Sequence, residues 1–334
     1  MKELHVPGVA LVAIRDARVV WRRNFGFRDQ ASGEPVDDGT TFEAQSMSKP
    51  VFAYRVMKLC EEGKLDLDAP LTKYTPDVFV KGDQRLERVT ARRVLSHATG
   101  SPNMRSKETP LRFEFTPGEG WAYSGEAYHY LQSTVTRLAG RFDENACGTY
   151  EQGYRVCASD FDVDMKTNLL EPFGMRSSGY VWSEWMDRKM ATPHDHDGKP
   201  MKRRRSSAID VARYGSLGSL LTTAGDFALF LLEVMRPKRS DSYRLNAASW
   251  KEMLRPQVKV PKFPMPCSWA LGWQIWHLEK GDVVAHGGDF DGVHSQAVFS
   301  TERKSGFVIL TNGERGGEMI WDRMLQELVV RLVL

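Results

Sequence analysis

A serine and a lysine three residues apart are the pair in this chain best suited to covalent chemistry. They are Ser46 and Lys49, which precede an apolar run at residues 50–60. Residues three apart share one face of a helix, so these two side chains can meet, whereas Ser48 points elsewhere. A lysine that acts as a base near pH 7 needs a pKa about 3 units below its ordinary value near 10.4, and burial lowers it. We predict that Ser46 is a nucleophile and Lys49 its base; the alternative is an exposed lysine in a serine-started helix.

The residues around this pair predict a buried helix with a distorted start. Apolar residues of the 50–60 run cover most of the helix circumference, and Gly63 fits a C-cap. Pro50 has no N–H, and its ring clashes with the carbonyl four residues earlier, which is that of Ser46. We therefore expect a tight first turn with Ser46 at its first position, where the backbone N–H is free to stabilise an oxyanion.

Short apolar runs near both ends of the chain predict one antiparallel sheet. Between them lies a region with helical spacing, and residues 319–334 have that spacing again. We expect an α/β fold of the α+β type, in which an antiparallel sheet built from both chain termini is flanked by helices and carries an inserted, mostly helical domain. The predicted boundaries are 1–62 and 265–334 for the sheet domain and 63–264 for the helical domain, with the active site in the cleft between them. The runs that predict strands are 9–14, 19–27, 271–276, 283–285, 295–299 and 306–310.

Composition and charge restrict the partners that the chain can have. Its 334 residues carry a net charge of +3, too small for a dedicated nucleic-acid binder, and the basic run at 202–205 is interpreted as a solvated loop. No stretch approaches the roughly 18 consecutive apolar residues of a membrane span, and no apolar signal segment follows the first residues. We predict no nucleic-acid partner and no membrane span. The location is cytoplasmic as the chain is written, and periplasmic or secreted if a leader has been removed.

The four cysteines and the histidine-rich loop do not indicate a metal site. None of the cysteines has the C-x-x-C spacing of a zinc site. Cys147 and Cys157 are interpreted as free thiols, with a disulfide between them as the alternative in an exported protein. Residues 194–197, His-Asp-His-Asp, lack the helical histidine spacing of a zinc hydrolase and are interpreted as a polar loop without a metal. We predict that the chain needs neither a metal nor an organic cofactor.

Several further stretches resemble one known family. The sequence Pro-Gly-Glu at 117–119 followed by Tyr123-Ser124-Gly125, together with His286-Gly287-Gly288, is similar to segments of the serine β-lactamase and penicillin-binding-protein-like family, in its class C β-lactamase and family VIII carboxylesterase branch. Matches at 95–100, 171–175 and 310–313 fall in the same order as in that family. The resemblance extends from about Val6 to the end of the chain.

The resemblance implies a catalytic arrangement. Ser46 would attack an acyl carbon, and Lys49 and Tyr123 would share proton transfer as general base and then acid. Because the ordinary pKa of tyrosine is near 10, a Tyr123 phenolate would need a cation such as Lys49 beside it. The backbone N–H groups of Ser46 and Asp289 would form the oxyanion hole. His286, Gly287 and Gly288 would line the site on a strand edge, where glycine lets the backbone approach a substrate closely.

Departures from the family pattern bear on the substrate. Gly125 stands where many members have asparagine, and His286-Gly287-Gly288 stands where they have lysine-threonine-glycine. Histidine, with an ordinary pKa near 6.5, is only about a quarter charged at pH 7, so a cation that would hold a substrate carboxylate is largely lost. Arg315 is a candidate replacement for that charge. The residues at both positions, Gly125 and His286, favour neutral esters over carboxylate-bearing substrates.

We therefore predict a serine hydrolase that forms an acyl-enzyme on Ser46, a carboxylesterase on short-chain esters with β-lactam hydrolysis as a side activity. One alternative is a class C-like β-lactamase or a D-amino-acid peptidase of the D-Ala-D-Ala carboxypeptidase type. A second is an inactive family member that serves as a binding or scaffold protein. His97 is predicted to form a hydrogen bond at a helix end. Five tryptophans are interpreted as core residues, with one or two lining an acyl pocket as the alternative: Trp121, Trp182, Trp185, Trp269 and Trp273.

Overall fold

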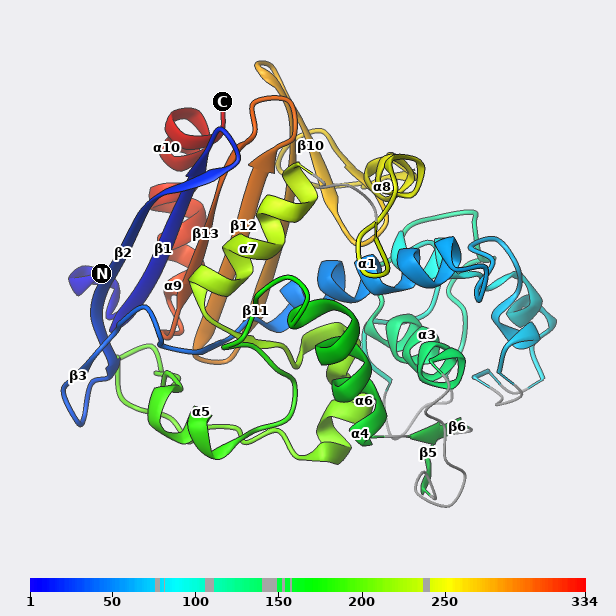
Figure 1. Cartoon of the computed structure of the whole chain (residues 1–334), viewed down its shortest axis with the longest axis horizontal. Helices are drawn as coiled ribbons and strands as arrows, with labels where there is room; N and C mark the ends of the chain where they lie inside the picture. Colours follow the sequence, from blue (N-terminus) through cyan, green and yellow to red (C-terminus); the bar gives the residue numbers. More distant parts are fainter. Residues whose placement is uncertain are drawn as a thin grey trace.

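The computed structural model describes residues 1–75, 79–80, 82–105, 111–139, 149–151, 154–156, 158–236 and 241–334. These residues form a nine-stranded antiparallel sheet with the order β3-β2-β1-β13-β12-β11-β10-β9-β8 (Figure 1). Its strands are β1 (Gly8–Arg15), β2 (Arg18–Asp29), β3 (Glu34–Pro35), β8 (Val258–Lys259), β9 (Cys267–Trp269), β10 (Gln274–Leu278), β11 (Gly281–Phe290), β12 (Val293–Ser300) and β13 (Ser305–Thr311). The first and last strands in the chain pair directly, β1 with β13, so both termini build one sheet. Cys147 and Cys157, whose state the sequence leaves open, lie outside the described residues.

Alternation along the central strands gives the sheet two apolar faces. In β1, Val9 and Leu11 belong to one hydrophobic cluster, and Ala10 and Val12 belong to the other. This division follows from the period of two, by which successive side chains point to opposite faces of a strand. Burial on both faces explains why β1 and β13 are continuous apolar runs.

Helices cover both faces of the sheet. Helix α7 (Ala224–Met235) packs against β1 and β13 on one face, and Figure 1 shows it crossing the strands there. The other face is covered by the C-terminal helical segment, which contains α9 (Gly316–Glu318), η6 (Met319–Met324), α10 (Leu325–Leu328) and η7 (Val329–Val333). Within the described residues, no helix combines the length and apolarity needed to cross a membrane.

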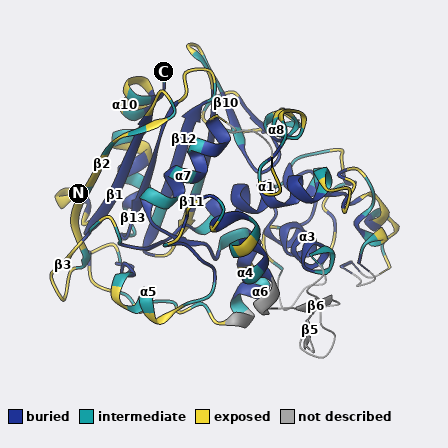
Figure 2. Cartoon of the chain, viewed as in Figure 1, coloured by how far each residue is buried: buried dark blue, intermediate teal, exposed yellow. Residues whose placement is uncertain are grey.

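The middle of the chain is mostly helical. Figure 2 shows that α1 and α3, at the centre of this part, are almost entirely buried. Two short strands, β4 (Phe42–Glu43) and β7 (Leu221–Thr222), pair beside them. The helices are α1 (Ser48–Glu61), α2 (Ala91–Leu95), α3 (Gly125–Leu138), α4 (Ala158–Met165), α5 (Glu184–Lys189), α6 (Ala208–Gly218) and α8 (Ala247–Leu254). Strands β5 (Thr149–Glu151) and β6 (Tyr154–Val156) pair in antiparallel orientation.

This architecture confirms the predicted fold class, an antiparallel sheet from both termini with helices on its faces and a mostly helical insertion. The exact domain boundaries stay a prediction. Helix α7 lies inside the range 63–264 expected for the helical domain, yet it packs on the sheet. One hydrophobic cluster runs from the sheet through α7 into α1 and α3, so the two parts share a core.

Candidate active site

Ser46 lies in a tight turn that leads into α1. The turn is the short 3-10 helix η2 (Gln45–Met47), and Pro50 is the third residue of α1. This is the distorted start that Pro50 predicts, although Gln45 and not Ser46 is the first residue of the turn. Gln45 has a φ of 49°, a left-handed conformation that is uncommon for a residue with a Cβ. Ser48 is buried, where its hydroxyl donates to Gln45 O at 2.7 Å and accepts from the Leu220 N–H, so its role is structural.

The Lys49 amine lies within reach of Ser46 in a buried position. Lys49 is 1% exposed, and its Nζ donates to Ser46 Oγ at 3.1 Å and to Leu217 O at 2.7 Å. Leu217 lies in the last turn of α6, where carbonyl groups lack partners within the helix. Burial lowers the pKa of Lys49 to about 7. A substantial fraction of Lys49 is therefore neutral at pH 7 and able to accept a proton.

Tyr123 completes a cluster with Ser46 and Lys49. Its hydroxyl is hydrogen-bonded to Ser46, and Lys49 Nζ lies 4.8 Å from the centroid of its ring. Burial raises the pKa of Tyr123, and the nearby Asp289 carboxylate raises it further, while the Ser46 hydrogen bond opposes both. Tyr123 is therefore a neutral phenol before the reaction begins. The two pKa shifts run in opposite directions, which suits Lys49 as the base and Tyr123 as the acid.

Strand β11 reaches the nucleophile turn at Gly288. A Cβ added to Gly288 would lie 2.2 Å from Ala44 O and 2.6 Å from Ser295 Oγ, so only glycine fits. Ser295, on the neighbouring strand β12, stabilises the contact between β11 and this turn, because its hydroxyl donates a hydrogen bond to Ala44 O at 3.0 Å. The structure thus brings Asp289, the next residue of β11, to the segment that contains Ser46. The two backbone N–H groups expected to form an oxyanion hole come from these two segments.

Replacement of Gly288 by alanine should reduce ester hydrolysis by at least about 10²-fold, because the added methyl pushes β11 away from the turn and displaces one oxyanion donor. Steady-state kinetics on a chromogenic ester would measure this loss. Gly225→Ala in α7 is the matched control, since its Cβ would meet no atom closer than 3.7 Å. Equal activity of Gly288→Ala and the control would contradict the close approach.

The histidine of the His-Gly-Gly segment carries no positive charge. His286 is 2% exposed, and its Nδ1–H donates to Gly287 O at 2.7 Å. Burial, reinforced by the charge of Lys49, lowers its pKa to about 3. His286 is thus neutral at every pH at which Lys49 can act as a base. Its positive charge at pH 7 is therefore smaller than the quarter expected from the ordinary pKa of histidine.

His97 and Trp269 pack against Tyr123. The sequence predicts a hydrogen bond at a helix end for His97, and a core position or the lining of an acyl pocket for Trp269. The His97 ring lies 4.2 Å from the Tyr123 ring between centroids, and Trp269 packs edge-on against His97 at 4.6 Å. His97 Nδ1 accepts the Ser124 N–H at 3.0 Å, so the other ring nitrogen carries the proton of the neutral ring. Burial, Lys49 and His286 lower the pKa of His97 well below its usual value. No local pattern marks these residues, because their contacts form only on folding.

Gly125 begins α3 beside the site, but its surroundings leave no room for an asparagine. Its N–H donates to Asn103 O at 3.0 Å, and a Cβ there would lie 2.7 Å from the same oxygen. The Asn103 side chain lies next to it, with Oδ1 accepting the Gly125 N–H at 3.1 Å. In this chain, Asn103 therefore occupies the space that a side chain at position 125 would need.

Arg315 does not reach the cluster as a free charge. Its guanidinium forms two hydrogen bonds with the Glu318 carboxylate, at 2.9 and 3.0 Å, and also approaches Glu3 O. The charge that the sequence reasoning offered as a replacement for the missing lysine is therefore neutralised by Glu318. A role of Arg315 in substrate binding stays a prediction, and it would require the guanidinium to leave Glu318.

The histidine-rich loop at 194–197 has a structural role. His194 is fully buried, with Nδ1 hydrogen-bonded to Asn312 O at 2.9 Å and Nε2 accepting the Gln30 N–H at 3.3 Å. Both ring nitrogens are therefore occupied by the backbone. Across the part of the chain that the structure describes, no group of three or more His, Cys, Asp or Glu side chains is arranged to hold a metal ion.

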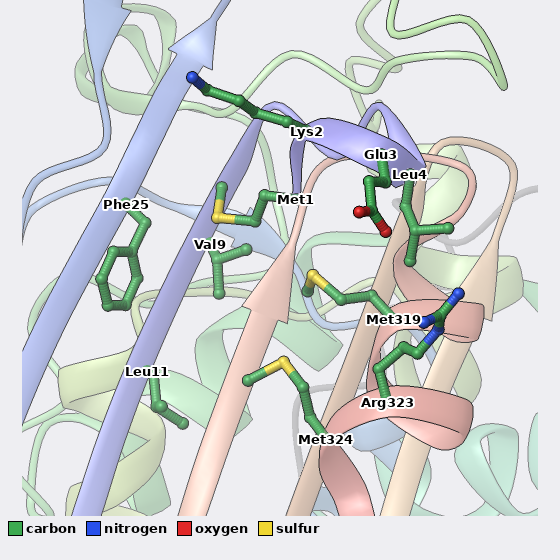
Figure 3. Close-up of a pocket in the computed structure, with 10 residues that line it drawn as sticks. All are labelled: Met1, Lys2, Glu3, Leu4, Val9, Leu11, Phe25, Met319, Arg323 and Met324. Atoms are coloured by element: carbon green, nitrogen blue, oxygen red, sulfur yellow. The ribbon is translucent and has the colours of Figure 1, made fainter.

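An apolar cavity of about 540 Å³ lies apart from the catalytic cluster. Figure 3 shows it between the N-terminal turn, strands β1 and β2 and the C-terminal helical segment. Its walls contain Val9, Leu11, Phe25, Met319 and Met324 and include no predicted catalytic residue. The cavity therefore carries no part of the chemistry described above.

Comparison with known proteins identifies relatives of several activities. A model of the Beta-lactamase family matches residues 1–330. Esterase EstB of Burkholderia gladioli is 27% identical over 244 residues, which cover 63% of this chain and 56% of EstB. Putative beta-lactamase-like 1 of Homo sapiens is 26% identical over 334 residues, which cover 93% of this chain and 63% of that protein. The chain thus spans about three fifths of the length of these curated relatives.

Solved structures share the fold at low sequence identity. An octameric penicillin-binding protein homologue from Pyrococcus abyssi superposes with a TM-score of 0.77 at 22% identity, covering 98% of this chain and 75% of that one. The D-alanine carboxypeptidase AmpC of Burkholderia cenocepacia superposes with a TM-score of 0.74 at 18% identity, covering 94% and 90%. The family match extends over nearly the whole chain and the fold agrees with it, so this chain belongs to the β-lactamase family, whose members are serine hydrolases.

Proposed function

We propose that the chain is a carboxylesterase that hydrolyses short-chain, uncharged esters through an acyl-enzyme on Ser46. The observation that carries this proposal is the state of the two described residues expected to hold a substrate carboxylate, neither of which offers a free positive charge. His286 is neutral, and Arg315 is paired with Glu318. The similarity to Esterase EstB supports the same choice.

Acylation begins with proton transfer from Ser46 Oγ to the neutral Lys49 amine, 3.1 Å away. Oγ attacks the ester carbon, and the negative charge that develops on the carbonyl oxygen is stabilised by the backbone N–H groups of Ser46 and Asp289. As the tetrahedral intermediate collapses, the Tyr123 hydroxyl protonates the departing alkoxide. Tyr123 then recovers its proton from the Lys49 ammonium, which returns the amine to its neutral form. The Leu217 carbonyl, 2.7 Å from Nζ, keeps the amine oriented throughout this cycle.

Deacylation repeats the steps with water in the place of the alcohol. A water molecule loses a proton to the Lys49 amine as its oxygen attacks the acyl carbon. Ser46 Oγ then leaves and is reprotonated from the ammonium, so the enzyme returns to its starting state. The products are a carboxylic acid and an alcohol, and every proton in the cycle is accounted for by Lys49 and Tyr123.

A fluorophosphonate probe tests whether the chain is an enzyme or an inactive binding protein. The wild type should gain the mass of one phosphonyl adduct in intact-mass spectrometry, because Oγ of a Ser46 beside a neutral Lys49 is nucleophilic. Ser46→Ala should gain none, and Ser48→Ala should still react, since the buried Ser48 hydroxyl is committed to Gln45 O. An unlabelled wild type, or equal labelling of Ser46→Ala, would favour the scaffold alternative.

A p-nitrophenyl butyrate assay run beside a chromogenic cephalosporin tests the substrate class. We expect kcat/KM to be at least about tenfold higher for the ester. A hydrogen bond to a charged group is worth about 1.5–3 kcal/mol, and the cephalosporin carboxylate lacks this partner. A D-alanyl-D-alanine peptide belongs in the same panel, because one structural neighbour is a D-alanine carboxypeptidase. Faster turnover of the cephalosporin or of the peptide would overturn the ester assignment.

A further inference from the structure

The sequence predicts a solvated loop for the basic run at residues 202–205. In the structure, its arginines instead form hydrogen bonds and ion pairs with several other segments. Arg203 donates to Thr192 Oγ1 and to Asp187 O, at 2.8 and 3.1 Å. Arg205 pairs with the Asp187 carboxylate at 2.7 Å. Arg204, between them, faces the segments that contain the proposed oxyanion donors.

Arg204 bridges two parts of the chain that are far apart in sequence. Its Nε and Nη2 donate to Glu43 Oε2 at 3.2 and 2.9 Å, and its Nη1 and Nη2 donate to Asp291 O at 3.0 and 3.1 Å. The guanidinium carbon also lies 4.7 Å from the centroid of the Phe290 ring. One planar guanidinium thus contacts Glu43, the last residue of β4, Phe290, the last residue of β11, and Asp291, which follows it. This geometry requires several N–H donors fixed in one plane, which arginine has and lysine lacks.

Glu43 extends the connection toward the nucleophile. Gln45 Nε2 donates to the same Glu43 Oε2 at 2.6 Å, and Gln45 is the left-handed residue directly before Ser46. Glu43 is only 8% exposed, and burial raises its pKa while Arg204 and Gln45 oppose that rise. A buried carboxylate needs such partners, so removal of Arg204 would leave Glu43 without its cation, and Gln45 would be bonded to a carboxylate that is no longer fixed.

We propose that Arg204 is a positioning residue for the oxyanion hole, which fixes the separation between the backbone N–H of Ser46 and that of Asp289. The chain of contacts Arg204–Glu43–Gln45 ends one residue before Ser46, and the contact with Asp291 ends two residues after Asp289. Oxyanion donors act only when both lie about 2.7–3.1 Å from the developing charge, so a small change in their separation weakens both. This inference rests on the proposed function, because it assumes acyl transfer at Ser46.

The test compares an ester with the thionoester that carries sulfur in place of its carbonyl oxygen. Sulfur is larger and a weaker hydrogen-bond acceptor, so a well-formed oxyanion hole favours the oxygen substrate and a loosened hole loses that preference. For Arg204→Ala we expect kcat on the ester to fall about 10²-fold, KM to stay within about twofold, and the ester-to-thionoester ratio of kcat to fall at least about tenfold. Ethylguanidinium added to Arg204→Ala should restore part of the ratio, because the guanidinium site is partly open to solvent, with the Arg204 side chain 33% exposed.

Two further variants separate positioning from folding. Arg205→Ala removes a neighbouring guanidinium that contacts Asp187 and the Trp182 ring, so its ratio should match the wild type. Arg204→Lys keeps the charge but not the planar set of donors, so its ratio should fall as in Arg204→Ala, which gives the same readout if the alanine variant does not fold. An unchanged ratio in folded Arg204→Ala or Arg204→Lys would overturn the inference, even if activity were lower. A wild type that neither hydrolyses the ester nor reacts with fluorophosphonate would instead overturn the proposed function.

Discussion

Replacement of Lys49 by methionine is expected to lower kcat/KM for esters by about 10³-fold, the contribution typical of a positioned general base. Methionine has a similar length and apolar character, so it fills the buried site without an amine. The variant therefore lacks the amine that lies 3.1 Å from Ser46 Oγ in the wild type. Ser46 and Tyr123 remain in place, so a residual rate from the oxyanion hole is expected, as is slow reaction with fluorophosphonate.

The pH dependence of the wild type should report the same group. Because burial lowers the pKa of Lys49 to about 7, the neutral amine is lost below that pH. The kcat/KM of the wild type should therefore fall about tenfold per pH unit on the acid side of pH 7 and level off above it. In Lys49→Met this acid limb should be absent. Full activity of the wild type at pH 5, or an unchanged limb in the variant, would rule out Lys49 as the base.

Stability measurements give an independent check on Lys49. The folded chain holds its amine with a pKa of about 7, whereas the unfolded chain keeps a value near 10.4, so the unfolded state binds more protons between these values. The Lys49 contribution to the free energy of unfolding therefore rises as pH rises from 7 to 10. In urea unfolding, Lys49→Met should show a smaller rise over this interval than the wild type. It should also be no less stable than the wild type at pH 7, which separates lost catalysis from misfolding.

Replacement of Asp164 by alanine is expected to lower the free energy of unfolding by about 3–5 kcal/mol. Asp164, in α4, accepts from Arg55 Nε and Nη2 of α1, both at 3.0 Å, and the side chains are 3% and 4% exposed. Asn168 adds a donor to the same carboxylate at 2.7 Å. The alanine would leave a buried guanidinium whose remaining carboxylate partner, Glu62, lies at 3.4 Å.

Urea unfolding of three variants would isolate this ion pair. Glu327→Ala is the control, because its partner Arg331 and Glu327 are 77% and 67% exposed, and exposed pairs contribute about 0–1 kcal/mol. The double variant Arg55→Met/Asp164→Leu should recover much of the loss, since an apolar pair of similar volume has no charge to desolvate. A loss below about 1 kcal/mol in Asp164→Ala would show that the buried pair is solvated in the folded chain.

Local rules of sequence predict the parts of this molecule that depend on spacing. The three-residue step from Ser46 to Lys49 predicts their contact, and Pro50 predicts the tight turn before α1. The short apolar runs near both termini predict the sheet, and the pairing of the first strand with the last confirms that both ends of the chain build it. Tyr123 and the His-Gly-Gly segment came instead from resemblance to a family.

Contacts across the fold could not be predicted in this way. Leu217 enters the site through a backbone carbonyl, which any residue type supplies. The partners of Arg204 are Glu43 and Asp291, which are far from it in sequence. The sequence alone therefore predicts a solvated charge at this position. The pairing of Arg315 with Glu318 did have a local signal, because Glu318 follows Arg315 by three residues and this spacing favours an ion pair within a helical turn.

The two edges of the sheet have a consequence for the behaviour of the chain at high concentration. Edge strands β3 and β8 are each only two residues long, and they contain Pro35 and Lys259. Proline offers no N–H to a further strand, and a lysine at an edge must be desolvated before another chain can pair there. Among the described strands, residues 18–26 of β2 pair only with β1, so this stretch is also an edge, and there the charged side chains of Arg18, Arg22 and Arg23 oppose growth of the sheet between molecules.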